Sequence, residues 1–206
     1  MAADHGQLPV CAVRRLCPAL RLTAFLALAG CVRQTPFALQ NITGLMPKLE
    51  FHLRDADARA VSAEDYRRKI VLLYFGYTSC PDVCPTTLAK LSQAVQSLGP
   101  QASNVRVLFV TVDPQRDTAA HLKSYVSYFG RQFVGLRGDD QALTELTRRY
   151  RVTYSMDPPD RNGNYSVEHS SAVFIFDQTG HPRLLAQSTD TANALAGDLR
   201  RLLRGD

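Results

Sequence analysis

The chain has 206 residues and a formal net charge of +5, with 45% hydrophobic and 21% charged residues. This length can bury a core without stabilising disulfides, and the composition excludes a disordered, collagen-like or multi-span membrane protein. The cysteines are the most informative residues, because three lie in the first 31 residues, two lie four apart, and none follows Cys84. A disulfide framework would spread paired cysteines through the chain, so this distribution excludes one.

The first 31 residues have the layout of a secretory signal peptide. Three arginines precede the uncharged run Leu22 to Gly30, which is far shorter than the ~20 residues that a membrane-spanning helix needs. Leu28-Ala29-Gly30-Cys31 resembles the cleavage box of a bacterial lipoprotein, whose cysteine is lipidated and becomes the first mature residue. We therefore expect residues 1–30 to be a signal peptide and residues 31–47 to be a lipidated N-terminus and tether. A generic signal peptide with a chance cysteine is the alternative.

Removal of residues 1–30 takes away three arginines and one aspartate, which lowers the formal net charge from +5 to +3. No run of basic residues interleaved with aromatic residues follows, so nucleic acid is not an expected partner. Arg200, Arg201 and Arg204 lie at the end of a predicted C-terminal helix, where cations complement the helix dipole. We interpret this basic cluster as a solvated helix face.

Residues 48–206 are expected to form one α/β domain. Continuous apolar runs rich in strand-forming residues predict buried strands at residues 70–75, 105–112 and 172–176. A turn at Asp177–Gly180 precedes a short strand around Leu184. Apolar residues at helical spacing predict four helices, around residues 88–98, 122–129, 143–150 and 195–202. Strands that alternate with helices imply an α/β sandwich with a mainly parallel centre and an antiparallel hairpin.

The chemistry concentrates at the end of the first buried strand, in the segment Gly76 to Pro85 (GYTSCPDVCP). Pro85 suits the first turn of a helix, so we expect Cys84 at or near the helix N-cap. Both Cys80 and Cys84 would then lie in a loop-to-helix turn beyond the carboxyl end of a central strand. Ligands commonly bind at this position in open α/β sheets.

The helix terminus alone is too weak to activate a thiol strongly. Lowering a thiol pKa by two units needs about 2.7 kcal/mol, whereas a helix terminus supplies about 0.3–1 kcal/mol and at most about 2. A coordinated metal, by contrast, deprotonates a thiol outright. Two neighbouring thiols without a nearby lysine therefore favour a pair that holds a metal or forms a disulfide, and soft thiolates select Cu(I) or Zn(II). A passive short-loop disulfide is the alternative.

Three segments in the same order resemble the Sco/SenC family, thioredoxin-fold proteins that assist assembly of the dinuclear copper centre of cytochrome c oxidase. Gly76–Pro85 resembles the copper-binding signature of the family, and Thr111–Thr118 (TVDPQRDT) resembles its DPxRDT stretch. Val167–Ser170 (VEHS) resembles the segment that bears its histidine ligand. The similarity runs from about Phe51 to the C-terminus. It implies an α/β, thioredoxin-like fold in which helices flank a central mixed β-sheet.

This resemblance implies that Cys80, Cys84 and His169 bind copper as Cu(I) and as Cu(II). Two thiolates suit Cu(I), and an added imidazole makes Cu(II) acceptable too. The resemblance places Asp113 near the site, where it would orient the histidine or modulate thiol protonation, although Asp-Pro is also ordinary turn chemistry. The remaining candidates are interpreted as structural: Asp117 or Thr118 as the cap of the helix that contains Leu122, and His52, His121 and His181 without a metal role.

The resulting hypothesis is a copper metallochaperone in the bacterial cell envelope, anchored on the periplasmic side of a membrane through lipidated Cys31. Its expected partners are the copper-centre subunit of cytochrome c oxidase and, upstream, another periplasmic copper chaperone or a thiol reductase. The alternative is a thiol-disulfide oxidoreductase that uses Cys80 and Cys84 on that subunit. Oxidoreductases of this fold usually have a cis-proline opposite the cysteines, where this chain has His169, and a thiol peroxidase is favoured still less. Asp55–Arg59 departs from the family pattern, in which a glycine-containing turn is expected.

Overall fold

The computed structural model describes residues 35–161 and 165–206. The expected signal peptide and the lipidation site Cys31 lie outside these residues. In the part of the chain that the structure describes, no helix has both the length and the apolar character needed to cross a membrane.

An eight-stranded mixed sheet forms the centre of the domain, with the strand order β1-β10-β9-β4-β5-β6-β2-β3. Its central strand, β4, pairs in parallel with β5 and antiparallel with β9. All seven residues of β4 are buried, as its continuous apolar run predicts. The strands are β1 (Gln40–Asn41), β2 (His52–Asp55), β3 (Ala60–Ser62), β4 (Ile70–Gly76), β5 (Val105–Thr111), β6 (Phe133–Arg137), β9 (Val173–Phe176) and β10 (Pro182–Ala186).

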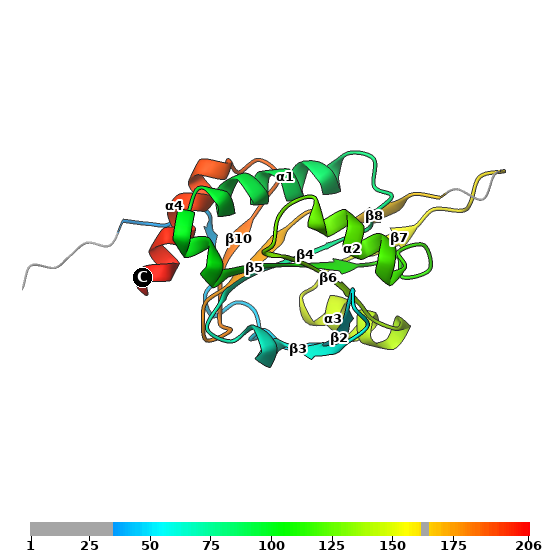
Figure 1. Ribbon diagram of the computed structural model, residues 1–206, viewed down its shortest axis with the longest axis horizontal. Coiled ribbons are helices and arrows are strands. Elements are labelled where there is room, and N and C mark those ends of the chain that lie inside the picture. The colour runs from blue at the N-terminus through cyan, green and yellow to red at the C-terminus, as the bar shows by residue number, and fades with distance from the viewer. Residues whose placement is uncertain (1–34, 162–164) are drawn as a thin grey trace, which may run out of the picture. The chain divides into compact units, whose positions relative to one another are not determined.

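Helices cover both faces of this sheet (Figure 1). They are α1 (Val83–Gln96), α2 (Ala119–Ser127), α3 (Asp140–Arg149) and α4 (Ala192–Arg204). Alternate side chains of β4 divide between the two faces, because successive residues of a strand point in opposite directions. Leu72 and Tyr74 belong to the core formed with α1, α2 and α4, whereas Leu73 and Phe75 belong to the core formed with α3. The expected mixed sheet flanked by helices is confirmed.

A second, two-stranded antiparallel sheet consists of β7 (Tyr154–Met156) and β8 (Val167–His169). Neither of these strands has a pattern from which it was predicted, and β6 was not predicted either. The segment of β6 contains Gly135 and lacks a long apolar run, so its pattern is weak. The fold needs this glycine, because a Cβ at Gly135 would lie 2.4 Å from Cγ of Leu122 on α2. Close packing of the helix on the sheet therefore explains a residue that weakens the strand signal.

The β2–β3 hairpin closes without the glycine that the family pattern leads one to expect. Ala58 adopts the left-handed conformation instead, with φ of 60°. One carboxylate oxygen of Asp55 accepts hydrogen bonds from the backbone N–H groups of Asp57 and Arg59, each at 2.9 Å. The aspartate thus stabilises a backbone conformation that is costly for alanine.

Residues 36–47, assigned above to the tether, pack against the domain in the structure. Leu39 and Ile42 are 3% and 4% exposed, and β1 pairs with β10. The buried carboxylate of Asp198 on α4 accepts a 2.8 Å hydrogen bond from the backbone N–H of Leu39. The compact unit accordingly begins at Pro36 rather than at residue 48. A chain that starts at Thr35 contains every buried residue of the described core.

Candidate metal centre

Cys80 and Cys84 lie in the connection from β4 to α1 and in the first turn of α1. The strand ends at Gly76, a loop carries Cys80, and α1 begins at Val83 after the N-cap Asp82. Cys84 is therefore in the first turn of the helix, near the N-cap as predicted. Cys80 is half-buried, Cys84 is fully buried, and both are free thiols. The backbone N–H of Cys84 points at Sγ of Cys80 over 3.5 Å. The helix start therefore brings the two sulfurs together beyond the carboxyl end of the central strand, as predicted.

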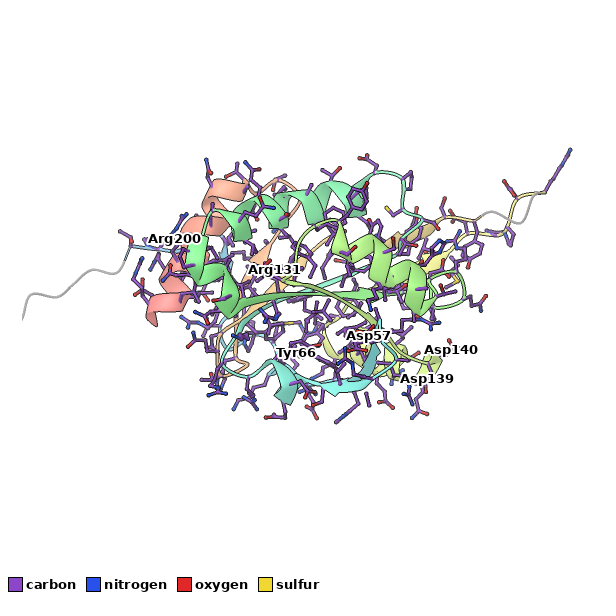
Figure 2. The ribbon with its side chains drawn as sticks, in the orientation of Figure 1. Asp57, Tyr66, Arg131, Asp139, Asp140 and Arg200 are labelled. Carbon is purple, nitrogen blue, oxygen red and sulfur yellow. The ribbon has the colours of Figure 1, made fainter. Side chains whose placement is uncertain are left out.

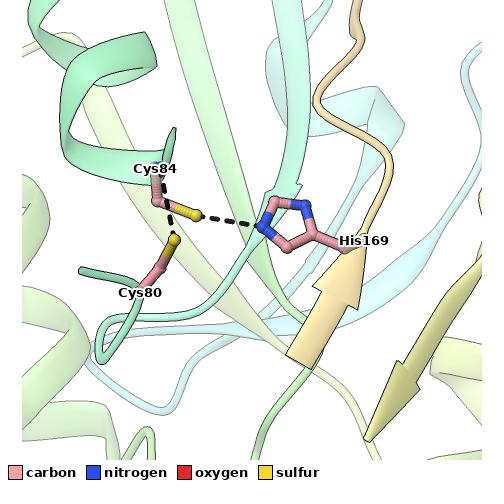
Figure 3. A group of neighbouring side chains, drawn as sticks. All are labelled: Cys80, Cys84 and His169. Carbon is pink, nitrogen blue, oxygen red and sulfur yellow. Dashed lines mark hydrogen bonds between the residues drawn. The ribbon is translucent and has the colours of Figure 1, made fainter. Parts of the chain in front are cut away.

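His169 reaches this pair from the other side of the loop. It is the last residue of β8, and its Nε2 lies 3.2 Å from Sγ of Cys84 (Figure 3). The ligand atoms of Cys80, Cys84 and His169 all lie within 4.8 Å of one another. The fold thus brings together three residues, of which the histidine is 85 positions from the nearer cysteine in sequence.

The second ring nitrogen of His169 determines which nitrogen can bind a metal. Nδ1 lies 3.0 Å from the backbone carbonyl oxygen of Ser170, which can only accept a hydrogen bond. A neutral imidazole in this position therefore carries its proton on Nδ1 and leaves the Nε2 lone pair directed at the cysteines. The rings of Tyr77 and Tyr74 pack edge-on against the imidazole, with centroids 5.9 and 6.2 Å away. These contacts hold the ring in an orientation suited to coordination.

The two thiols have opposite electrostatic environments. Burial raises the pKa of the Cys84 thiol to about 12. Partial burial also acts to raise the pKa of Cys80, but the backbone N–H groups of Cys84 and Asp82 that face its sulfur outweigh this effect and lower the pKa. Cys80 is thus the better metal-free nucleophile, and Cys84 needs a metal or a partner to become a thiolate.

Gly76 permits the close approach of strand and helix at the site. A Cβ at this position would lie 2.7 Å from Sγ of Cys84 and 2.7 Å from Cε2 of Phe109. Neither neighbour can move easily, because both side chains are fully buried. The glycine at the start of the GYTSC segment is therefore required by the packing of the buried sulfur.

Asp113 is fully buried beside the site but does not bond to His169. Its carboxylate pairs with the guanidinium of Arg116 and accepts a 2.8 Å hydrogen bond from the hydroxyl of Tyr165. The Arg116 guanidinium lies 3.6 Å from the ring centroid of Tyr165 and 5.5 Å from that of Tyr77. Any influence of Asp113 on the imidazole would therefore pass through Arg116 and Tyr77. The hypothesis that Asp113 tunes the site stays a prediction.

Asp117, predicted as an alternative to Thr118 for the cap of α2, has a different role. Thr118 caps α2, because its hydroxyl accepts a hydrogen bond from the N–H of His121, whereas the carboxylate of Asp117 is fully buried. Asp117 accepts hydrogen bonds from the hydroxyl of Thr111 and from both the N–H and the hydroxyl of Thr78, at 2.5, 3.0 and 2.5 Å. It thereby fastens the cysteine loop to the end of β5. Only its place in the TVDPQRDT run hinted at this role.

The other histidines lie elsewhere in the fold. His52 is on β2, His121 is exposed on α2, and His181 bonds to Thr179 in the β9–β10 turn. Within residues 35–161 and 165–206, the cluster of Cys80, Cys84 and His169 is the one group of three such side chains placed to hold a metal ion.

These features define a protein with helices on both faces of a mixed sheet and a soft three-ligand site of two sulfurs and one nitrogen. Such a donor set suits Cu(I) and Zn(II), and the imidazole extends it to Cu(II). A profile of the SCO1/SenC family matches residues 42–204, so the chain belongs to that family.

Curated and solved relatives agree with this family and with a thioredoxin-like fold. The mitochondrial SCO2 homolog of Bos taurus is 38% identical over 164 residues, which are 75% of this chain and 62% of the relative. Copper-bound ScoI of Bradyrhizobium japonicum is 35% identical, with a TM-score of 0.70 over 76% of this chain and 99% of that one. Copper-bound yeast Sco1 is 29% identical, with a TM-score of 0.70 over 78% and 91%. The chain spans 62% to 64% of the length of the first curated relatives.

Gly76→Ala should lower the free energy of unfolding by about 1–3 kcal/mol, because the new methyl group overlaps Cys84 and Phe109. Urea denaturation measures this change. Gly197→Ala is the matched control, since a Cβ there meets nothing within 4 Å inside α4, and it should stabilise the chain by about 0.5–1 kcal/mol. Equal effects of the two substitutions would contradict the packing argument.

Alkylation of the metal-free, reduced chain should distinguish the two thiols by pH. Because a lowered pKa leaves more thiolate at a given pH, iodoacetamide should label Cys80 increasingly as the pH rises from 6 toward its ordinary pKa of about 8.5. Cys84, with a pKa of about 12, should stay unlabelled over the same range. Peptide mass spectrometry gives the two rates, and Cys80→Ser should remove the early reaction. Comparable labelling of both residues would refute the assignment.

Proposed function

We propose that this chain binds one copper ion through Cys80, Cys84 and His169. The observation that carries the proposal is the convergence of the three ligand atoms within 4.8 Å. Two sulfur ligands favour Cu(I), and His169 Nε2 supplies the harder third ligand that Cu(II) accepts. The copper-bound structures of ScoI and yeast Sco1, which are 35% and 29% identical to this chain, support copper over zinc.

We further propose that the bound copper is cargo, passed by ligand exchange to the copper-centre subunit of cytochrome c oxidase. Cys80 and His169 are only partly buried, and His169 also borders a surface pocket of about 320 Å³ that is lined by residues of β7, β8 and their flanks. An incoming ligand can therefore approach the metal while buried Cys84 keeps its hold. The oxidase subunit follows from the family role rather than from any contact in this chain. Another copper chaperone or a thiol reductase would load or reduce the site.

Titration of the chain that starts at Thr35 tests the copper site. We expect one Cu(I) or one Cu(II) per chain, and we expect His169→Ala to weaken Cu(II) binding at least about tenfold while Cu(I) changes much less, because the two thiolates remain. Competition with chelators of known affinity measures both constants. His181→Ala is the control, since His181 lies in the β9–β10 turn and bonds to Thr179. Unchanged Cu(II) binding by His169→Ala would show that the histidine is not a ligand.

A thiol-disulfide oxidoreductase is the second candidate, and the contrast between the two thiols favours it. The more acidic, half-buried Cys80 could attack a disulfide of the target and form a mixed disulfide. Cys84 would then attack Cys80, releasing the reduced target dithiol and leaving this chain oxidised. A separate thiol reductase would return the pair to the dithiol state. This reaction needs both cysteines but not the imidazole.

Oxidase assembly in a strain that depends on this chain separates the two candidates. Copper delivery predicts that His169→Ala and Cys80→Ser both reduce oxidase activity and the copper content of its subunit. A reductase predicts that Cys80→Ser alone does so, since His169 takes no part in thiol exchange. Immunoblots for equal protein levels provide the control. Full oxidase activity with His169→Ala would reject the delivery proposal.

We also propose that residues 1–30 are removed and that Cys31 carries the membrane anchor on the periplasmic side of the cell envelope. The lipoprotein-like box Leu28-Ala29-Gly30-Cys31 supports this proposal. Several acyl chains on one cysteine would anchor the domain stably. The intact mass of the mature chain tests it, because an unmodified Cys31 thiol would exclude lipidation there.

A further inference from the structure

The metal site lies where the central parallel strands of the sheet end. The opposite side of the sheet, where these strands begin, differs from it in charge. The parallel strands β4 and β5 begin side by side, with Ile70 paired to Val105, and the cysteine loop follows their far ends. Phe176 at the end of β9 pairs with Val71, so the β9–β10 turn belongs to the edge where β4 begins. The last turns of α1 and α4 meet nearby, because Arg200 donates a 2.6 Å hydrogen bond to the carbonyl oxygen of Ser97. We call the side of the sheet on which β4 and β5 begin, together with the β9–β10 turn and the last turns of α1 and α4, the amino edge.

Basic residues gather at the amino edge. Its cationic side chains come from several elements: Arg67, Arg68, Lys69, Arg106, Arg131, Arg183, Arg200, Arg201 and Arg204. Three of them form ion pairs, with Glu64, Asp177 and Asp206 as partners. The ion pairs of the described residues include no partner for the other six. With Asp65 and the C-terminal carboxylate, these partners make five negative groups against nine cations, so this edge keeps an excess of positive charge.

Contacts within the protein leave much of this charge facing outward. Lys69 and Arg106 both donate to the carbonyl oxygen of Ser103, at 3.0 and 3.1 Å, which brings two cations to one point without a carboxylate. Arg68 and Arg204 are exposed. Within the domain, Arg200 lies at the end opposite to Asp139 and Asp140, which follow the carboxyl end of β6 (Figure 2).

The chain also enters the domain at the amino edge. The carbonyl oxygen of Pro36 accepts a 3.0 Å hydrogen bond from Arg201, and the Arg201 guanidinium lies 4.1 Å from the ring centroid of Phe37. The described chain therefore starts beside the last turn of α4 (Figure 1). Only five residue steps separate Cys31 from Pro36, and a fully extended chain of that length spans about 17–18 Å. An anchor at Cys31 would hold the amino edge within that distance of a membrane.

We propose that the amino edge is a membrane-facing surface that rests on anionic phospholipid headgroups, with the metal site directed away from the bilayer. Lysine and arginine close to an anionic leaflet are attracted to it, and the attraction acts only within about a Debye length, roughly 8 Å at physiological salt. This part of the inference rests on the anchor proposed at Cys31, whose short tether would allow the arginines to come within that range. The copper ligands would then face the space in which a partner subunit presents its own ligands. The surface itself does not depend on what the metal site binds.

Vesicle binding by the chain that starts at Thr35 tests this surface without any lipid anchor. The domain should float with vesicles of phosphatidylcholine and phosphatidylglycerol at low salt, and it should not float with phosphatidylcholine alone. Arg68→Glu combined with Arg204→Glu should weaken binding at least about tenfold, since each cation near the surface contributes and each reversal adds repulsion. Arg148→Glu combined with Arg161→Glu makes the same charge change on α3 and beyond β7, and it should bind at least about threefold better than the first pair.

Circular dichroism and thermal melting establish that both double variants are folded. No binding to the anionic vesicles, or equal binding to both vesicle types, overturns the proposal. Equal losses in the two double variants also overturn it, because they would show attraction by net charge without a defined face. Rising salt should release the unmodified domain, and binding that persists at 1 M salt would point to insertion of apolar groups and reject the electrostatic surface.

Discussion

The metal site depends on one constraint, the close packing of buried strand β4 against the first turn of α1. Gly76 leaves just enough room for the sulfur of Cys84, and the hydroxyl of Tyr74 reaches that sulfur over 3.6 Å. β4 pairs with β9 as far as Tyr74 and with β5 as far as Gly76, and these pairings restrain the end of the strand. The cysteine loop therefore starts from a fixed point, and the position of one thiol is set by core packing rather than by a metal.

The loop beyond this point is held by carboxylates. Buried Asp117 ties Thr78 to Thr111 at the end of β5, and buried Asp113 holds Arg116 against the aromatic rings beside His169. Burial of a carboxylate costs free energy unless its oxygens accept hydrogen bonds. The carboxylates of Asp113 and Asp117 both accept several. One flank of the site is thus organised by hydroxyl and amide donors and the other by an ion pair. The arrangement keeps three potential ligands close while Cys80 and His169 stay partly accessible.

The molecule separates two kinds of chemistry along its strands. The candidate metal ligands lie beyond the end of β4, and an excess of cationic groups lies at the amino edge, where Pro36 enters. This division follows from the parallel pairing of β4 and β5, which puts both strand starts at one end and both strand exits at the other.

Local patterns in the sequence were sufficient to predict the main strands, the four helices and the place of the two cysteines. A continuous apolar run or a helical stripe of apolar residues shows directly which side chains of an element are buried. Similarity to a known family pointed to His169. Only the tertiary structure decided the rest. Strands as short as β7 and β8 are not long enough to show a residue pattern, and they are stabilised by pairing with each other. The 3.2 Å approach of His169 to Cys84, the buried role of Asp117 and the packing of residues 36–47 all join segments far apart in the chain. No local pattern encodes such contacts, because their energy comes from neighbours that only the folded chain supplies.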